Sequence, residues 1–223
     1  MTAPPSPLSE SELISQWMNL WTRTRQRPKS MADFAAETGL SEIAIADHVS
    51  NLAQLEKLVF SAFFTQTLTL LQASPDYRDY NYEEHLLAIY FTFFELLTAN
   101  RDYVLLALQD GAPAKLGVNP LNLPKLALLQ QAFTATISQI APLNLPVPIP
   151  MLNQVGAKGL AEATWLQLLS ILAFWISDES PEFEKTDAFI EKSVGAGADL
   201  MKFTDLSRLS DWGKFLFQER RPF

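Results

Sequence analysis

Basic side chains at alternate positions form the first group in this sequence whose types and spacing suit binding chemistry. They are Arg23, Arg25, Arg27 and Lys29. Cationic side chains beside a helix N-terminus bind phosphate groups, because they displace counterions while the free backbone N–H groups attract the same anion. Ser41 and His48, farther along the chain, also carry groups suited to contact with nucleic acid. The pattern predicts a phosphate-binding segment, and the alternative is a solvated face.

Aromatic and polar side chains on the apolar helical segments form a second group. They are His85, Tyr90, Phe94, Glu95, Tyr103 and Trp165. Pockets between the helices of a bundle are mainly apolar and contain a few polar groups that orient the ligand. This group therefore predicts a cavity for a small apolar or lipid-like molecule, and the alternative is that each side chain fills the core.

Catalytic and metal-binding patterns do not occur in the sequence. The chain has no cysteine and only two histidines, His48 and His85, which have no neighbouring ligands at the spacing of a metal site. Nucleophile triads and glycine-rich phosphate loops do not occur either. We therefore expect no enzymatic activity, no metal site and no cofactor.

The elements that must position the first group begin with two short helices in residues 30–49. Ser30 is placed to cap the first helix, and Gly39 stands where a chain leaving a helix adopts a left-handed conformation. Ser41 then predicts a second N-terminal cap. The second helix is expected to bury Ile43, Ile45 and Val49. Two short helices joined by a glycine-containing turn are typical of a helix-turn-helix.

The rest of the chain has helical patterns throughout, so the predicted fold class is all-α. Apolar periodicity, capping residues and proline or glycine breaks predict the positions of the helices. They are 8–25, 51–73, 82–99, 100–110, 125–140, 158–177, 181–203 and 206–218. The sequence therefore predicts an N-terminal three-helix domain with a helix-turn-helix, followed by a larger helical bundle.

Gly195 and Gly197, in the helix predicted over residues 181–203, indicate close packing. Each interior glycine costs a helix roughly 1 kcal/mol relative to alanine, so a packing reason is expected. We expect the helices over residues 158–177 and 181–203 to form a subunit interface, and the alternative is a close crossing within one chain.

The first helix, the helix-turn-helix and the long apolar helices follow one another in an order typical of one family. The residues that carry the likeness are Phe34 and Ala35, the run from Ala36 to Ser41, Ile45, Val49, Leu55 and Leu58. In these residues the chain resembles the TetR family of transcriptional regulators. The resemblance implies a DNA-binding domain over residues 1–50 and a ligand-binding and dimerisation domain over residues 51–223. It also implies a homodimer that binds duplex DNA and whose last two long helices form a four-helix bundle with the second subunit.

The surface chemistry of the motif departs from this resemblance. Family members commonly have a lysine after the turn, a tyrosine in the second helix and a phosphate-binding lysine at the start of the next helix, whereas this chain has Glu42, Ala46 and Leu52. Residues 1–50 contain six acidic against four basic residues, which gives −2, and the whole chain carries −8. Acidic surfaces repel the DNA backbone.

Two functional hypotheses follow from these observations. The first is an atypical, ligand-responsive transcriptional regulator that contacts DNA through the basic segment. The second is a TetR-like fold that has lost DNA binding and binds an apolar or lipid-like ligand or a partner. In the second form the chain is similar in outline to the TetR-like accessory proteins of quinone biosynthesis.

Targeting signals are also absent from the sequence. The first ten residues contain no basic segment followed by an apolar one, so they do not resemble a signal peptide. The most apolar run, Leu166–Ile176, is too short to cross a bilayer. Because the chain also lacks cysteine, we expect a soluble protein of a reducing, cytoplasmic compartment.

Overall fold

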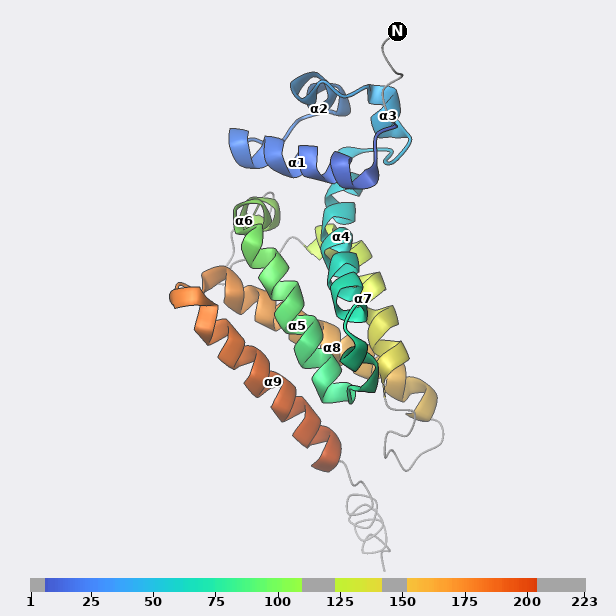
Figure 1. Cartoon of the computed structure of the whole chain (residues 1–223), viewed down its shortest axis with the longest axis vertical. Helices are drawn as coiled ribbons and strands as arrows, with labels where there is room; N and C mark the ends of the chain where they lie inside the picture. The colour runs from blue at the N-terminus through green and yellow to red at the C-terminus, as the bar shows by residue number, and fades with distance from the viewer. Residues whose placement is uncertain (1–6, 110–122, 142–151, 204–223) are drawn as a thin grey trace, which may run out of the picture. The chain divides into compact units, whose positions relative to one another are not determined.

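The computed structural model describes residues 7–109, 123–141 and 152–203, and within these residues every regular element is a helix. The α-helices are α1 Glu10–Thr24, α2 Met31–Thr38, α3 Glu42–Ala46, α4 Leu52–Gln72, α5 Tyr82–Ala99, α6 Arg101–Gln109, α7 Ala127–Ile140, α8 Leu152–Ser177 and α9 Glu184–Phe203 (Figure 1). Three short 3-10 helices, η1 Pro75–Asp79, η2 Leu123–Leu126 and η3 Pro181–Phe183, lie between them. The all-α prediction is confirmed, while the helix predicted over residues 206–218 lies outside the described residues.

The chain divides into two compact units. The first comprises Met1–Thr69 and Phe93–Gln131, and the second comprises Leu70–Thr92 and Ala132–Phe223. Three helices, α4, α5 and α7, therefore contribute residues to both units. The compact units do not divide at residue 50, so the expected functional boundary there stays a prediction.

Helix α1 supplies the aromatic core of the first unit. The helix begins after Ser9, whose Oγ accepts a hydrogen bond from the Glu12 N–H at 3.2 Å. Its buried face contains Trp17, whose ring meets the Phe34 ring of α2 edge to face at 5.2 Å. Trp17 Nε1–H also donates to the Tyr103 hydroxyl at 3.2 Å. Both tryptophans of α1, Trp17 and Trp21, are therefore core residues.

The residues predicted to begin and end α2, Ser30 and Gly39, have the predicted roles. Ser30 Oγ accepts from the Asp33 N–H at 3.1 Å, and Gly39 has a φ of +72°, a conformation that side chains disfavour. In Figure 1, α2 and α3 lie together on one side of α1. Ser41 has the extended backbone of an N-cap residue, but its side chain makes no capping hydrogen bond.

Ile43 does not belong to the inward face of α3, as the sequence predicted. Its side chain is 77% exposed, whereas Ile45 and Val49 are buried. Each residue of an α-helix turns about 100°, so positions two apart point to nearly opposite sides. Because α3 is only five residues long, it can bury one of the two isoleucines and exposes the other.

Helix α8 forms the centre of the second unit. Within the described residues its segment Lys158–Ser177 is long and apolar enough to cross a membrane, with a mean hydropathy of 1.4. The same length and composition occur in the core helices of globular proteins, and one side of this segment, including Leu168, Ile171 and Trp175, is buried. The helix begins at Leu152, earlier than the predicted residue 158.

Asp178 joins the end of α8 to the start of α9. Its carboxylate accepts four hydrogen bonds, from the backbone N–H and the hydroxyl of both Ser180 and Thr186, over 2.6–2.9 Å. Burial raises the pKa of this carboxyl, but the four hydrogen bonds outweigh burial and hold the pKa at about 2. The junction therefore depends on an ionised Asp178.

Replacing Asp178 by alanine is expected to lower the free energy of unfolding by about 2 kcal/mol at pH 7. The folded-state pKa lies below the usual value of 3.8, so the stabilisation is present above that value and is lost as the pH falls toward about 2. Urea unfolding at pH 7 and at pH 2.5 measures both effects. Glu179→Ala, at the exposed neighbouring residue, is the control and should change stability by less than about 0.5 kcal/mol. An equal loss for the two variants would contradict the assignment.

Candidate nucleic-acid surface and ligand groove

The outer surface of α3 is acidic and apolar. Ser41, Glu42, Ile43 and Asp47 are exposed on or beside this short helix. Direct reading of bases in the major groove relies on arginine, lysine, asparagine or glutamine side chains. None of these types occurs between Ser41 and Ser50. This surface therefore lacks the side chains that read bases, and any cations for phosphate contact would come from other segments.

Two of the four predicted phosphate-binding cations form ion pairs inside the first unit. Arg25 Nη2 lies 3.4 Å from Asp102 Oδ2 of α6, and both side chains are exposed. Arg27 Nε donates to Glu56 Oε1 of α4, and the Glu56 side chain is only 2% exposed. The pair of Arg27 with a buried carboxylate is a structural contact, because moving the guanidinium to a phosphate would leave Glu56 with one cation fewer.

Lys125 of η2 completes a buried charge cluster with Arg27 and Glu56. Its Nζ lies 3.0 Å from Glu56 Oε2, donates to the Ala107 carbonyl oxygen at 2.9 Å and stands 5.0 Å from the centre of the Trp21 ring. Each contact partly replaces the water that the ammonium loses on burial. We call Arg27, Glu56 and Lys125 the buried charge triad.

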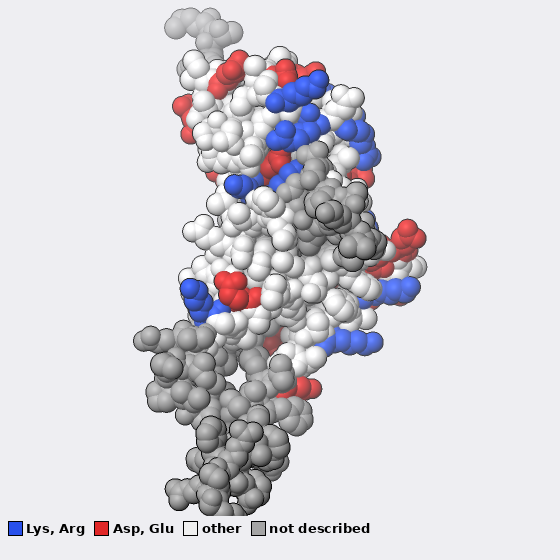
Figure 2. Space-filling view, turned by 180° about the vertical axis from the view of Figure 1, so that it is seen from behind, with Lys and Arg blue, Asp and Glu red and all other residues white. Residues whose placement is uncertain are grey.

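Of the other predicted DNA-binding residues, one makes a hydrogen bond within the chain and three are exposed. The ring of His48 is half-buried, and its Nε2–H donates to the Leu8 carbonyl oxygen at 2.7 Å, since a carbonyl can only accept. Arg23, Lys29 and Ser41 are exposed. On the face shown in Figure 2, acidic side chains lie among the basic ones, so that face presents no uninterrupted positive patch.

The six predicted ligand-binding residues do not gather around one cavity. Phe94, Glu95 and Tyr103 belong to the first unit, and the other three belong to the second. Four are core residues, namely Tyr90, Phe94, Tyr103 and Trp165. Burial raises the pKa of the Tyr90 and Tyr103 phenols well above the usual value, so both act as hydrogen-bonding hydroxyls at neutral pH.

His85 and Glu95 lie at the surface of α5 or close to it. His85 packs edge to face against the Tyr77 ring at 4.6 Å, and its Nδ1 lies 2.9 Å from the Asn81 carbonyl oxygen. Glu95 is exposed. Neither residue lines the apolar groove that the second unit contains, so the ligand role of this group stays a prediction.

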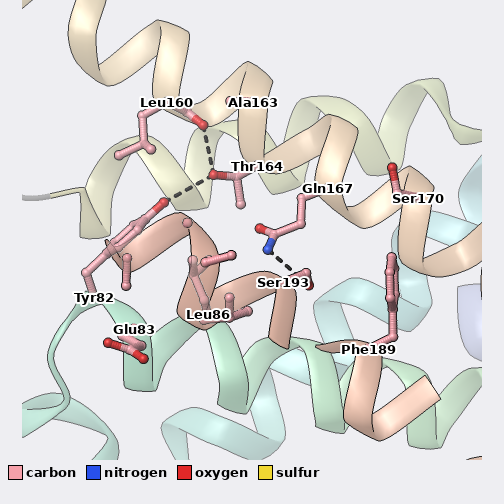
Figure 3. A pocket seen from close by; sticks show the side chains of 14 residues that line it. Tyr82, Glu83, Leu86, Leu160, Ala163, Thr164, Gln167, Ser170, Phe189 and Ser193 are labelled. Carbon is pink, nitrogen blue, oxygen red and sulfur yellow. Dashed lines mark hydrogen bonds between the residues drawn. The ribbon is translucent and has the colours of Figure 1, made fainter. Parts of the chain in front are cut away.

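That groove lies in the second unit between α5, α8 and α9, and its volume is about 460 Å³ (Figure 3). Leu86, Leu160 and Val194 contribute apolar surface to it, and Phe189 stands at one end. Small-molecule sites in proteins have volumes of roughly 300–1,000 Å³ and mainly apolar walls. The groove therefore has the size and the surface of a ligand site.

A chain of hydrogen bonds runs along the groove. Thr164 Oγ1 lies 3.1 Å from the Tyr82 hydroxyl and donates to the Leu160 carbonyl oxygen. Gln167 Nε2 donates to Ser193 Oγ at 3.2 Å, as the dashed lines of Figure 3 show, while its Oε1 accepts from the Tyr90 hydroxyl at 3.0 Å. These contacts fix the orientation of the Gln167 amide and satisfy its buried polar atoms.

Sequence reasoning did not select Thr164, Gln167 or Ser193 as site residues. Gln167 was visible only as a polar interruption of the apolar run Leu166–Ile176. Thr164 and Gln167 are three residues apart, a spacing that places them on one face of a helix. A polar pair on one face of an otherwise apolar helix was the signal for this groove.

Comparisons with known proteins connect the C-terminal part of the chain with one family. Residues 85–216 match the family model described as "Tetracyclin repressor-like, C-terminal domain". Among solved structures, the chain is similar to a protein of unknown function from Rhodococcus sp. RHA1, with 14% identity and a TM-score of 0.49 over 87% of this chain and 96% of that chain. The comparison with curated proteins gives no match.

Proposed function

We propose a function from one premise: this chain belongs to the TetR family, since the matching family model covers more than half of it. We propose that it is a ligand-responsive transcriptional regulator that binds duplex DNA as a homodimer. In this proposal, ligand binding in the second unit changes the spacing of the two helix-turn-helix motifs of the dimer.

The observation that carries the proposal is the intact architecture of the helix-turn-helix. Ser30 caps α2, Gly39 makes the left-handed turn, and Ile45 of α3 is buried. Packing against α1 holds the pair in place and leaves the outer side of α3 open to a partner. Helix pairs of this kind place their second helix in the major groove of DNA.

Phosphate contacts in this proposal come from the exposed cations, Arg23 and Lys29, with Ser41 at the N-terminus of α3. Affinity supplied by cations falls with salt, with a slope of about −0.9 per phosphate contact. The acidic surface of α3 makes DNA binding weak, and the few phosphate contacts give a shallow salt dependence, with a slope of about −4 for the four cations of a dimer.

A filter-binding titration at low salt, with the DNA upstream of the protein's own gene, tests the proposal. The double variant Arg23→Gln/Lys29→Gln removes four cations from the dimer, so it should bind at least tenfold more weakly and should reduce the salt slope by about 4. Lys192→Gln removes an exposed cation of α9 and serves as the control, with unchanged affinity expected. If the wild-type chain binds neither this DNA nor random duplex, the regulator proposal is wrong.

The dimer in this proposal forms through α8 and α9. On α8, Leu166 is 63% exposed, and Phe174 is 37% exposed and stacks on Phe189 of α9 at 5.0 Å. An added Cβ at Gly195 or Gly197 would meet nothing within 4 Å among the described residues, so a close crossing within the chain does not explain these glycines. A partner helix would cover the exposed apolar surface, and light scattering would report the mass of the dimer.

A second function is favoured by the surface of the first unit. Arg25 and Arg27 are paired with Asp102 and Glu56, and Glu42 and Ile43 occupy the exposed side of α3. These features suit a TetR-like protein that binds an apolar ligand or a partner and has given up DNA. Native mass spectrometry of the purified chain distinguishes the two functions, because a co-purified apolar molecule together with no DNA affinity supports the second.

A further inference from the structure

We infer that the outer face of α3 binds a basic partner protein. In the complex, the Ile43 side chain enters an apolar pocket of the partner, and lysine or arginine side chains of the partner lie beside Glu42 and Asp47. The inference deepens the second proposed function, since it names the partner class and the surface and rests on the partner-binding part of that function. It does not require that the chain binds DNA or a small molecule.

The outer face of α3 has an apolar centre between two acidic edges. It comprises four exposed residues, Glu42, Ile43, Ala46 and Asp47. The Asp47 N–H donates to the Ile43 carbonyl oxygen at 3.0 Å, so Asp47 continues the helical register. At about 100° per residue these four side chains fan over about 140°, in the order Glu42, Ala46, Ile43 and Asp47. The two carboxylates therefore flank the two apolar side chains.

The charge of this face suits a basic protein surface. No lysine or arginine occurs between Lys29 and Lys57, whereas the same stretch contains five acidic residues. Neither Glu42 nor Asp47 forms an ion pair with another residue that the structure describes. Exposed carboxylates repel DNA phosphates and anionic lipids, and they attract lysine and arginine side chains. The net charge of −8 also attracts a basic partner at long range.

The core behind α3 holds this face ready for a partner. Ile45 on the inward side is 0% exposed and Val49 is buried, whereas Ile43 is 77% exposed. A surface that is already ordered loses little conformational entropy on binding. Protein interfaces concentrate their binding energy in a few central side chains with polar contacts around them. Ile43 between two carboxylates has this arrangement, at the size of a small, transient interface.

Fluorescence anisotropy of the full chain with labelled helical peptides tests the inference. The probes are an amphipathic peptide of leucine and lysine, its counterpart of leucine and glutamate, and a polar peptide of serine and lysine. We expect the leucine–lysine peptide to bind at least tenfold more tightly than the other two, because it alone combines apolar contact with positive charge. Ile43→Ser should weaken its binding at least fivefold. Glu42→Gln/Asp47→Asn should weaken it about fivefold and reduce its salt dependence.

Two matched controls place equivalent changes elsewhere on the surface. Leu70→Ser removes an apolar side chain of α4 that is 47% exposed, and it should leave peptide binding unchanged. Asp76→Asn/Asp79→Asn neutralises the same number of exposed carboxylates on η1, and it should also bind as the wild type does. All the substituted side chains are exposed, so circular dichroism should show the native helix content in every variant.

Four results would overturn the inference. They are failure of the wild type to bind the leucine–lysine peptide, unchanged binding by Ile43→Ser, unchanged binding by Glu42→Gln/Asp47→Asn, and losses as large in the controls. The filter assay for DNA and native mass spectrometry for an apolar ligand use other probes. Either can fail while the peptide binds, and either can succeed while the peptide does not bind. The failure of this inference is therefore distinguishable from the failure of each proposed function.

Discussion

Replacing Glu56 by glutamine is expected to lower the free energy of unfolding by about 3–5 kcal/mol, because it removes the only anion of the buried charge triad. Glutamine keeps the size of the side chain but removes the negative charge that the Arg27 guanidinium and the Lys125 ammonium share. Lys125 is 8% exposed, so water compensates little of this loss. Urea unfolding followed by circular dichroism measures the change.

Two further variants distinguish the effect of the buried charge on stability from the effect of side-chain packing. Glu37→Gln alters an exposed carboxylate of α2 and should change stability by less than about 0.5 kcal/mol. The triple variant Arg27→Met/Glu56→Leu/Lys125→Met replaces the whole triad by apolar side chains, and it should recover most of the lost stability. A triple variant as unstable as Glu56→Gln would show that shape, and not charge, sets the cost.

Replacing Trp17 by alanine is the second large effect, with an expected loss of about 3–5 kcal/mol. The ring is 0% exposed and meets the rings of Trp21 and Phe34 edge to face at 5.5 Å and 5.2 Å. Its removal leaves a cavity between α1 and α2, and it also removes the N–H that donates to the buried Tyr103 hydroxyl. Thermal unfolding and the near-ultraviolet circular dichroism of the aromatic core report the change.

Trp17→Phe is the matched variant for this prediction. It keeps an aromatic ring against Phe34 and removes the indole N–H and part of the volume, so it should cost about 1–2 kcal/mol. Since α2 packs on this ring, Trp17→Ala should also weaken any DNA binding by the helix-turn-helix. Stability losses of equal size for the two variants would contradict a dominant packing role.

Local signals in the sequence predicted most of the fold. Caps and breaks such as Ser30 and Gly39 depend on neighbours within four residues, and the structure uses them as expected. The inward faces of the longer helices followed from apolar periodicity. Periodicity failed at Ile43, because a helix of five residues is too short to define one face.

The candidate sites could not be predicted fully, because they depend on contacts between residues that are far apart in the sequence. Arg27 pairs with a carboxylate of α4 and shares it with a lysine of η2, and no spacing rule connects these three positions. Helical periodicity also does not tell whether an inward aromatic side chain fills the core or lines a cavity. Tyr90 fills the core, whereas the smaller Thr164 and Gln167 leave room for the groove.

The buried charge triad has a consequence for protein engineering. It ties the segment after α1 to α4 and to η2, and the Trp17–Tyr103 contact ties α1 to α6. A fragment cut after α3 would keep Arg27 and Trp17 but lose Glu56 and Tyr103, to which they bond. The helix-turn-helix of this chain is therefore not expected to fold as a separate fragment, and a chimaera should carry α4, α6 and η2 along with it.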